Sequence, residues 1–263
     1  YSLPTGVHLQ LFPDVTGTRP IDLAGGSVMG SLPLDYDQVA VIQTIRSGVT
    51  VNLTANSYLG QIYPAGTSNG ANHIIYDMGK LNTSTNLNPS DVGLRGSYLV
   101  IDGNITGSFD LTKVGQDVIK LAGSNSFGNL YIEDGIIQMG RNNALASTTV
   151  VSTRGAGSTG ILDLNGYNQE IAGLTGPGGS VNNSAMDINT LALNTTSDQT
   201  YNGSVSGSVA VIKKGAGKQT FTNVNDYQGG PVLEAGTLSV AQDASLGRVH
   251  VTTRTDSLRF TAG

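Results

Sequence analysis

Apolar and polar residues alternate in short runs along most of the chain, and each run ends at Gly, Asn or Asp. Val49, Val51 and Leu53 alternate with polar residues, and so do Leu238 and Val240. A period of two is typical of a β-strand that buries one face and exposes the other. Turn-forming pairs such as Asn-Gly and Asp-Gly separate the runs. The pattern therefore predicts an all-β chain of many short strands.

Composition supports this interpretation. The 263 residues include 36 Gly and only 13% charged residues, which favours turns and half-exposed strands over long helices. Hydrophobic residues make up 38%, enough to bury a core, so the chain is not of the disordered class. There is no Cys, which excludes disulfide scaffolds, thiolate metal sites and cysteine nucleophiles.

The sequence repeats itself at an offset of one hundred residues. Residues 103–115 and 203–215 share Gly, Gly, Ser, Lys and Gly at the same places, with Lys113 matching Lys213. Further positions match downstream in the same order: Asn125 with Asn225, Phe127 with Tyr227, Glu133 with Glu234, Gly135 with Gly236, and Leu145 with Leu246. The chain thus holds two copies of one unit, at about 103–146 and 203–247.

Short alternating strands fit either an antiparallel sandwich or barrel, or a solenoid. The solenoid is favoured because stacked coils place like residues above one another, which explains copies with matching Asn and aromatic positions. We expect a right-handed parallel β-helix over residues 49–263. With about 20–25 residues per coil and strands about 4.8 Å apart, the chain as a whole would make roughly a dozen coils. Residues 1–48 contain several prolines and little periodicity, and we expect an irregular segment or cap there.

The second copy carries a resemblance to a known family. The segments that carry it are Val211-Ile212-Lys213-Lys214-Gly215-Ala216-Gly217, Asn225-Asp226-Tyr227-Gln228-Gly229-Gly230, Glu234-Ala235-Gly236-Thr237-Leu238 and Ala244-Ser245-Leu246-Gly247. They resemble the autotransporter-associated β-strand repeat, also called the passenger-associated transport repeat. Val211 replaces the opening leucine of that pattern, and the first copy departs further, with Asp117 in place of a glycine. The resemblance implies a passenger-type β-helix that is exported to the surface of a Gram-negative bacterium or beyond it.

Charge and hydropathy limit the classes of partner. The net charge of −5 is spread along the chain without a basic block, so no nucleic-acid partner is predicted. The longest apolar stretch, Val39 to Ile45, is far shorter than the roughly 20 residues of a membrane-spanning helix. We therefore expect no membrane insertion by this segment.

Histidines and paired carboxylates are the candidate residues for catalysis or metal binding in this sequence. His8, His73 and His250 show no metal-ligand spacing, so no metal or other cofactor is predicted. Asp35 and Asp37 would share one strand face at about 7 Å, a separation that suits two carboxylates acting on a glycosidic bond. A surface turn at that segment is the favoured interpretation. For the adjacent Glu133 and Asp134 a turn role fits better than catalysis.

Serine and glycine motifs point to turns instead of chemistry. Segment 155–160 and segment 203–207 hold Gly and Ser at tempting intervals, but neither matches a protease or lipase motif, and we expect loop serines. Gly215-Ala216-Gly217-Lys218 lacks the remaining residues of a phosphate loop. Segment 173–179 is expected to form a corner whose backbone only glycine tolerates.

Taken together, the sequence predicts an extracellular structural or adhesive β-helix with no catalytic site. Its expected partners are surface glycans or copies of itself stacked end to end into filaments. The alternative is a polysaccharide-active β-helix enzyme, a lyase or glycoside hydrolase, with its carboxylates at Asp35 and Asp37.

Overall fold

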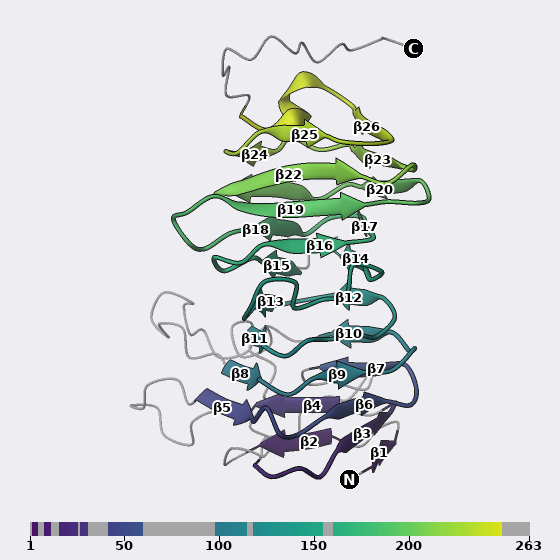
Figure 1. Ribbon diagram of the computed structural model, residues 1–263, viewed down its shortest axis with the longest axis vertical. Coiled ribbons are helices and arrows are strands. Elements are labelled where there is room, and N and C mark those ends of the chain that lie inside the picture. The colour runs from purple at the N-terminus through teal and green to yellow at the C-terminus, as the bar shows by residue number, and fades with distance from the viewer. Residues whose placement is uncertain are drawn as a thin grey trace, which may run out of the picture.

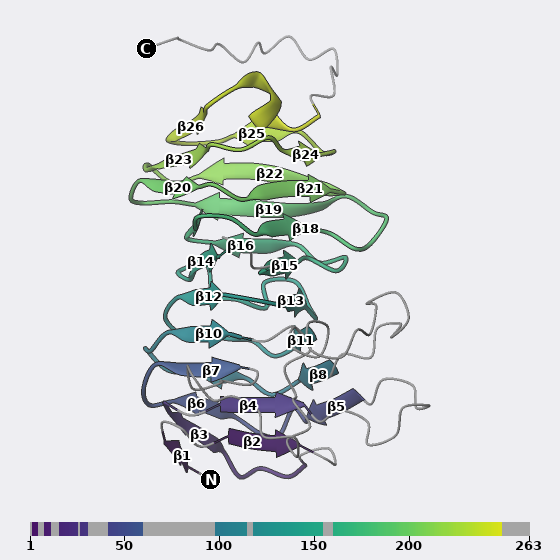
Figure 2. The same cartoon turned by 180° about the vertical axis from the view of Figure 1, so that it is seen from behind.

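A computed structural model describes residues 2–4, 8–11, 16–25, 27–30, 42–59, 98–114, 118–154 and 160–248. This part of the chain contains twenty-six short β-strands and one 3₁₀ helix, Asp243–Leu246. The strands stack along one axis from the N-terminal to the C-terminal end (Figures 1 and 2). Every pair of named strands is parallel, so the predicted parallel β-helix is confirmed and the antiparallel alternative is wrong.

Three faces make up the solenoid, and the chain visits them in turn. Face one holds β1 (Ser2–Pro4), β3 (Ile21–Ala24), β6 (Val51–Leu53), β9 (Ile105–Thr106), β16 (Gln169–Ile171), β19 (Asn189–Asn194), β22 (Val209–Lys214) and β25 (Pro231–Leu233). Face two holds β2 (His8–Leu11), β4 (Ser27–Gly30), β7 (Ser57–Leu59), β10 (Leu111–Lys113), β12 (Leu130–Ile132), β14 (Val150–Thr153), β17 (Gly173–Thr175), β20 (Gln199–Tyr201), β23 (Lys218–Phe221) and β26 (Thr237–Val240). Face three holds β5 (Ile42–Ile45), β8 (Tyr98–Ile101), β11 (Val118–Leu121), β13 (Ile136–Met139), β15 (Ile161–Asp163), β18 (Ser180–Asn182), β21 (Ser204–Gly207) and β24 (Asp226–Tyr227).

The ladder of face three is an unbroken sheet of eight strands, so the described solenoid has about eight turns. The expectation of a dozen coils was too high because it divided the whole chain by the coil length. The coil length itself agrees with the prediction: from β8 onward, successive strands of this face begin 20, 18, 25, 19, 24 and 22 residues apart. The right-handed sense of the winding stays a prediction.

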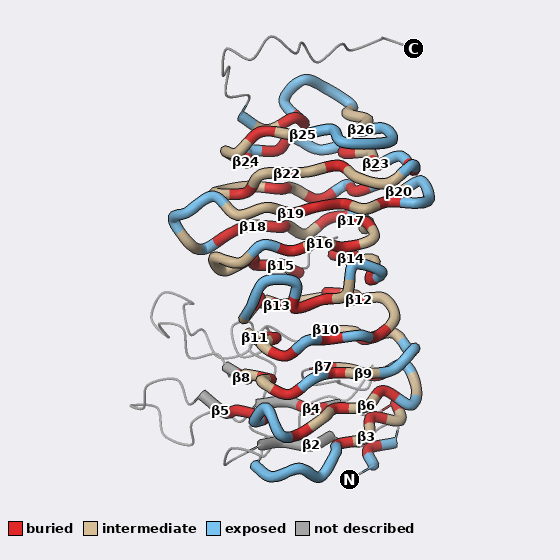
Figure 3. The backbone as a smooth tube through the Cα atoms, in the orientation of Figure 1, coloured by how far each residue is buried: buried red, intermediate tan, exposed pale blue. Residues whose placement is uncertain are grey.

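Register stacks apolar side chains into columns inside the solenoid. On face three, one column runs through six buried residues: Leu99, Ile119, Ile137, Leu162, Val181 and Val205. Figure 3 shows the buried positions recurring along the stacked strands. Each such side chain contributes about 1.5–3 kcal/mol when it leaves water. A single turn could not bury its own apolar side chains, because the turns above and below it cover them.

The first forty-eight residues also contribute strands to the ladders. β1 pairs with β3, β3 pairs with β6, and β5 pairs with β8, all in parallel. Where an irregular segment or cap was expected, the described residues therefore continue the winding toward the N-terminus.

The two repeat copies share strand order but lie on different faces. β9, β10 and β11 of the first copy lie on faces one, two and three. Their counterparts β21, β22 and β23 lie on faces three, one and two. An offset of one hundred residues is thus not a whole number of turns. The unit that repeats is a set of strands and corners, which fits any of the three faces.

Side-chain amides replace backbone pairing where a ladder is interrupted. Gln169 accepts a hydrogen bond from the Leu145 amide (3.1 Å) and donates one to the Leu145 carbonyl (3.0 Å). Gln219 binds the amide (3.1 Å) and carbonyl (2.8 Å) of Leu174 in the same way, from two strands away on face two. Because unpaired backbone groups in a core are costly, these glutamines keep the interrupted ladders stable.

Each copy also places one buried asparagine between successive turns. Asn225 accepts a hydrogen bond from the Val205 amide (2.8 Å) and donates one to the Ser245 carbonyl (2.6 Å). Asn125 accepts in the same way from the Ile105 amide (2.8 Å) and donates to a carbonyl of the following turn. The matching asparagines thus join three turns each, which is the physical reason why they recur.

Candidate functional site

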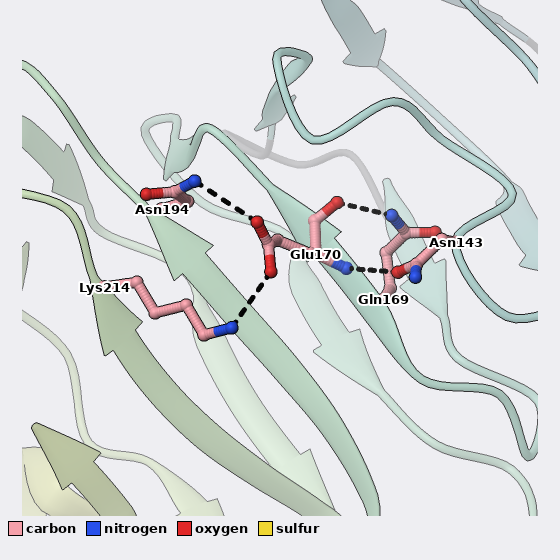
Figure 4. Close-up of polar contacts among 5 residues, drawn as sticks. All are labelled: Asn143, Gln169, Glu170, Asn194 and Lys214. Carbon is pink, nitrogen blue, oxygen red and sulfur yellow. Dashed lines mark hydrogen bonds and ion pairs between the residues drawn. The ribbon is translucent and has the colours of Figure 1, made fainter. Parts of the chain in front are cut away.

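The outward side of face one carries a cluster of polar side chains from four successive turns. We call Asn143, Glu170, Asn194 and Lys214 the Glu170 cluster (Figure 4). Glu170 lies in β16, Asn194 in β19 and Lys214 in β22, while Asn143 precedes them in the previous turn. Parallel pairing of the strands brings these side chains together: Asn194 is in register with Lys214, and Glu170 is in register with Ala192, two residues before Asn194.

Glu170 is the centre of the cluster. Its carboxylate accepts a hydrogen bond from Asn194 Nδ2 (3.2 Å) on one oxygen and pairs with Lys214 Nζ (3.1 Å) on the other. The Glu170 backbone amide donates to Asn143 Oδ1 (2.9 Å), and its carbonyl accepts from Gln169 Nε2 (2.6 Å). The carboxylate is therefore held at both oxygens and its backbone at both ends, which fixes its position.

Local sequence explains why the glutamate points outward. Gln169 and Ile171 are buried on either side of Glu170, so the alternation of β16 sends the carboxylate to the surface. In register with Glu170 on β19 is Ala192, a small residue that leaves space above the strand. The long glutamate side chain can then reach diagonally to a neighbour on the next strands.

The electrostatics of the cluster follow from its exposure. The side chains of Lys214 and Glu170 are 33% and 29% exposed, so the ion pair is partly shielded from water. The hydrogen bond and charge of Glu170 raise the pKa of Lys214 above its ordinary value, and Glu234 adds a smaller effect in the same direction. The Lys214 ammonium group is therefore protonated at neutral pH, and the ion pair with Glu170 forms a fixed pattern of donors and acceptors.

This pattern suits binding through hydrogen bonds. A carboxylate, an ammonium group and two amides offer both donors and acceptors to the hydroxyl groups of a ligand. Among the described residues there is no group of three His, Cys, Asp or Glu side chains placed to hold a metal ion.

Sequence reasoning did not single out Glu170 or Asn143. The spacing of the cluster was the available signal, because 143, 170, 194 and 214 are separated by 27, 24 and 20 residues, about one coil each. Without knowing which strand pairs with which, such a series cannot be told from any other set of surface polar residues.

The candidate residues of the sequence analysis are not brought together. His73, His250, Asp35 and Asp37 lie outside the described residues, and for His8 only the backbone of β2 is described. The alternative with an aspartate pair stays a prediction.

Glu133 and Asp134 have structural partners at a corner. Glu133 pairs with Arg154 at the surface (3.3 Å), and Arg154 lies over the ring of Tyr131 at 6.0 Å from its centroid. The side-chain Oδ1 of Asp134 accepts a hydrogen bond from the amide of Gly135 (2.9 Å). Asp134 therefore has the turn role that was expected.

The predictions for the glycine and serine segments 203–207, 155–160 and 173–179 compare differently with the structure. Ser204 and Ser206 lie in strand β21 and not in a loop, because Val205 between them is buried and sets the alternation of a strand. Segment 155–159 lies outside the described residues. Gly176 has a φ of +126°, and a Cβ there would lie 2.0 Å from the Thr153 carbonyl oxygen. The predicted corner is confirmed for residues 176–179, whereas Gly173–Thr175 at the start of that segment form strand β17.

Comparison with known proteins finds one matching family model and several bacterial relatives that are similar to parts of this chain. Residues 211–240 match the passenger-associated-transport-repeat family. The chain is 27% identical over 213 residues to the adhesin BmaC autotransporter of Brucella suis biovar 1 (strain 1330), which covers 74% of this chain and 6% of the relative. It is 32% identical over 105 residues to the serine protease EspP of Escherichia coli, covering 38% of this chain and 8% of the relative.

A further match is the serine protease EspC of Escherichia coli O127:H6 (strain E2348/69 / EPEC), 34% identical over 104 residues, 38% of this chain and 8% of the relative. The chain thus spans less than a tenth of the length of the curated relatives it matches. No solved structure matches it. In the part of the chain that the structure describes, no helix is long and apolar enough to cross a membrane. Residues 211–240 therefore carry a passenger-associated transport repeat, and the chain is similar to autotransporter passenger domains, which are secreted to the cell surface or the extracellular space.

Proposed function

We propose that this chain is an adhesive segment that binds surface glycans through the outward side of face one. The observation that carries the proposal is the Glu170 cluster, in which Glu170, Lys214 and Asn194 hold fixed positions on a stacked sheet. Glycan hydroxyls are recognised by such preorganised donors and acceptors. Similarity to an adhesin over 74% of the chain supports the same conclusion.

A rigid sheet suits this task. The strands β16, β19 and β22 are tied together by continuous parallel pairing, so the cluster loses little conformational freedom when a ligand binds. Preorganised polar groups give useful affinity even where each hydrogen bond is weak. Repetition of turns along a solenoid also allows several weak contacts with one long polysaccharide to add up.

Binding to immobilised acidic and neutral polysaccharides tests the proposal. The purified chain is compared with Glu170→Gln, which removes the charge at the centre of the cluster but keeps its size. We expect a loss of binding of about ten- to a hundredfold, since a hydrogen bond to a charged group contributes about 1.5–3 kcal/mol. Asp198→Asn is the matched control, because Asp198 forms an exposed ion pair with Lys218 (3.2 Å) and is not a member of the cluster. Equal binding by the parent chain and both variants, or no binding to any polysaccharide, would contradict the proposal.

The proposal assigns no enzymatic activity to this segment. Two of the relatives are named as serine proteases, but they match only 38% of this chain and 8% of their own length. The experiment that separates the two classes is product release from a panel of polysaccharides and proteins. Turnover that is lost in Asp35→Asn would favour the polysaccharide-active alternative.

Self-association by end-to-end stacking of coils is a separate proposal. Its basis is general: parallel strands at the end of a ladder present unpaired N–H and C=O groups to another chain. Light scattering over a range of concentrations measures it directly. Growth of elongated particles with concentration is expected, and a constant monomer mass at high concentration would end this proposal.

A further inference from the structure

One lysine in each repeat copy is buried, although lysine is among the residues that are almost never fully buried. Lys213 extends inward from β22 and has 0% exposure. Its Nζ lies at the corner that follows the strand and donates hydrogen bonds to three backbone carbonyls. These are the carbonyl of Lys214, that of Gly215 (2.9 Å) and that of Ala235 (3.2 Å).

The first copy contains the same arrangement. Lys113 also has 0% exposure, and its Nζ donates to the carbonyls of Val114 (2.9 Å) and Asp134 (3.2 Å). Lys113 lies on face two and Lys213 on face one. The buried lysine therefore belongs to the repeat unit and not to one face of the solenoid.

The number and direction of the acceptors fit a protonated amine. An ammonium group has three N–H donors and no acceptor, and the site around Lys213 supplies three carbonyl oxygens. A neutral amine has only two donors and would leave one carbonyl of the corner unpaired. The oxygens come from two successive turns, since Ala235 follows β25, so one ammonium group holds both turns together.

Glycines shape the site. Gly215 and Gly236 have φ values of +69° and +72°, the left-handed region that turns the chain sharply. A Cβ on Gly236 would lie 2.9 Å from Lys213 Nζ and 2.3 Å from the Gly215 carbonyl oxygen. The glycines of the repeat thus leave the space that the ammonium group and its carbonyls occupy.

We propose that the corner after β22, and the equivalent corner after β10 in the first copy, is a binding site for a primary ammonium group. The chain fills each of these sites with its own lysine. The site consists of carbonyl oxygens that converge between two turns, and its ligand class is a primary alkylammonium ion. When the lysine is shortened, the vacated site binds such an ion from solution. This inference is independent of the adhesive function, because it concerns the inside of the winding and not its outer face.

Rescue by a small molecule tests the site. Lys213→Ala removes three methylene groups and the ammonium group, which together correspond to n-propylammonium. Two or more buried carbonyls then lose their donors, so we expect the thermal midpoint to fall by about 10 °C. Addition of n-propylammonium chloride should restore most of the loss, by the mass-action effect of a ligand that binds only the folded state. Tetramethylammonium chloride carries the same charge without an N–H donor and should restore none.

Two further variants separate this site from a general salt or packing effect. Lys213→Met keeps the side-chain stem as far as Cε but lacks the ammonium group. Its stem occupies the space that n-propylammonium needs, so the variant should be destabilised and should not respond to this ion. Lys218→Ala removes an exposed lysine of the following strand and should change neither the midpoint nor the response to amines.

The proposal stays testable if Lys213→Ala does not fold. In that case the refolding yield is measured with n-propylammonium and with tetramethylammonium, and Lys113→Ala is examined in the same way for the first copy. Equal stability of Lys213→Ala and the parent chain would overturn the proposal. An equal response to the two ammonium salts would overturn it as well.

Discussion

Replacement of the buried Asn225 is the sharpest test of how the repeat holds its turns together. The side chain is 5% exposed and joins the amide of Val205 to the carbonyl of Ser245. Asn225→Ala leaves that donor and that acceptor without partners, and no water can reach them easily because Val205 and Ser245 are both 0% exposed.

The size of the effect follows from these two groups. A buried backbone group that loses its partner costs about 1–3 kcal/mol, so the variant should be destabilised by about 2–6 kcal/mol. For a domain of this size, that corresponds to a fall of roughly 5–20 °C in the thermal midpoint. Asn225→Asp keeps the acceptor for the Val205 amide but places a second oxygen against the Ser245 carbonyl. It should be destabilised by a comparable amount at neutral pH.

Hydrogen exchange at single amides is the appropriate assay, since a solenoid can open locally without unfolding as a whole. We expect the Val205 amide to lose protection in Asn225→Ala, while amides in the N-terminal turns keep theirs. Asn202→Ala is the control: its side chain accepts a hydrogen bond from Thr222 (2.7 Å) at the surface, and the change should cost less than about 0.5 kcal/mol. Unchanged protection at Val205, or equal effects of the two variants, would refute the assignment of a turn-joining role.

Three other substitutions follow from the same structure. Gly236→Ala puts a Cβ 2.3 Å from the Gly215 carbonyl oxygen at a φ of +72°, and should cost at least about 2 kcal/mol in chemical denaturation; Gly17→Ala, with a positive φ but open space around it, should cost less. Gln219→Leu leaves two buried backbone groups unpaired and should be destabilised by about 2–6 kcal/mol. Gln219→Glu should be only slightly destabilised at acidic pH, because its protonated side chain can again donate a hydrogen bond. Burial raises the pKa of Tyr201 above its ordinary value of 10.0, so the contribution of the neutral ring to the free energy of unfolding is fully present below about pH 10 and is lost as the pH rises further. Denaturant titrations of Tyr201→Phe should show a shallower decline of stability at alkaline pH, and an unchanged decline would count against this cause.

Much of the fold was predictable because its physical causes are local. Alternation at Val49, Val51 and Leu53 predicted a strand with one buried face, and Val51 and Leu53 are buried in β6. Matching residues one hundred positions apart predicted stacked coils, and Asn125 and Asn225 make matching contacts. The count of turns and the strands of the first forty-eight residues were not predicted, because proline-rich segments with weak alternation give no period to count.

The candidate site could not be predicted from the sequence, for a different reason. Glu170, Asn194 and Lys214 are ordinary polar residues in the sequence, and nothing local distinguishes them from other surface positions. They form a cluster only because three strands from successive turns lie side by side in one register. The buried state of Lys213 likewise follows from a carbonyl supplied by the next turn.

By itself, the sequence determined that this chain forms many short strands with one buried face, since hydrophobic alternation and turn chemistry act over a few residues. Its repeat at one hundred residues favoured a solenoid, and the structure showed that the strands are parallel. The tertiary structure alone decided on which face each copy lies, which polar side chains meet on the surface, and which lysines enter the core. Those outcomes depend on the lengths of all the intervening corners summed along the chain, and no short segment contains that information.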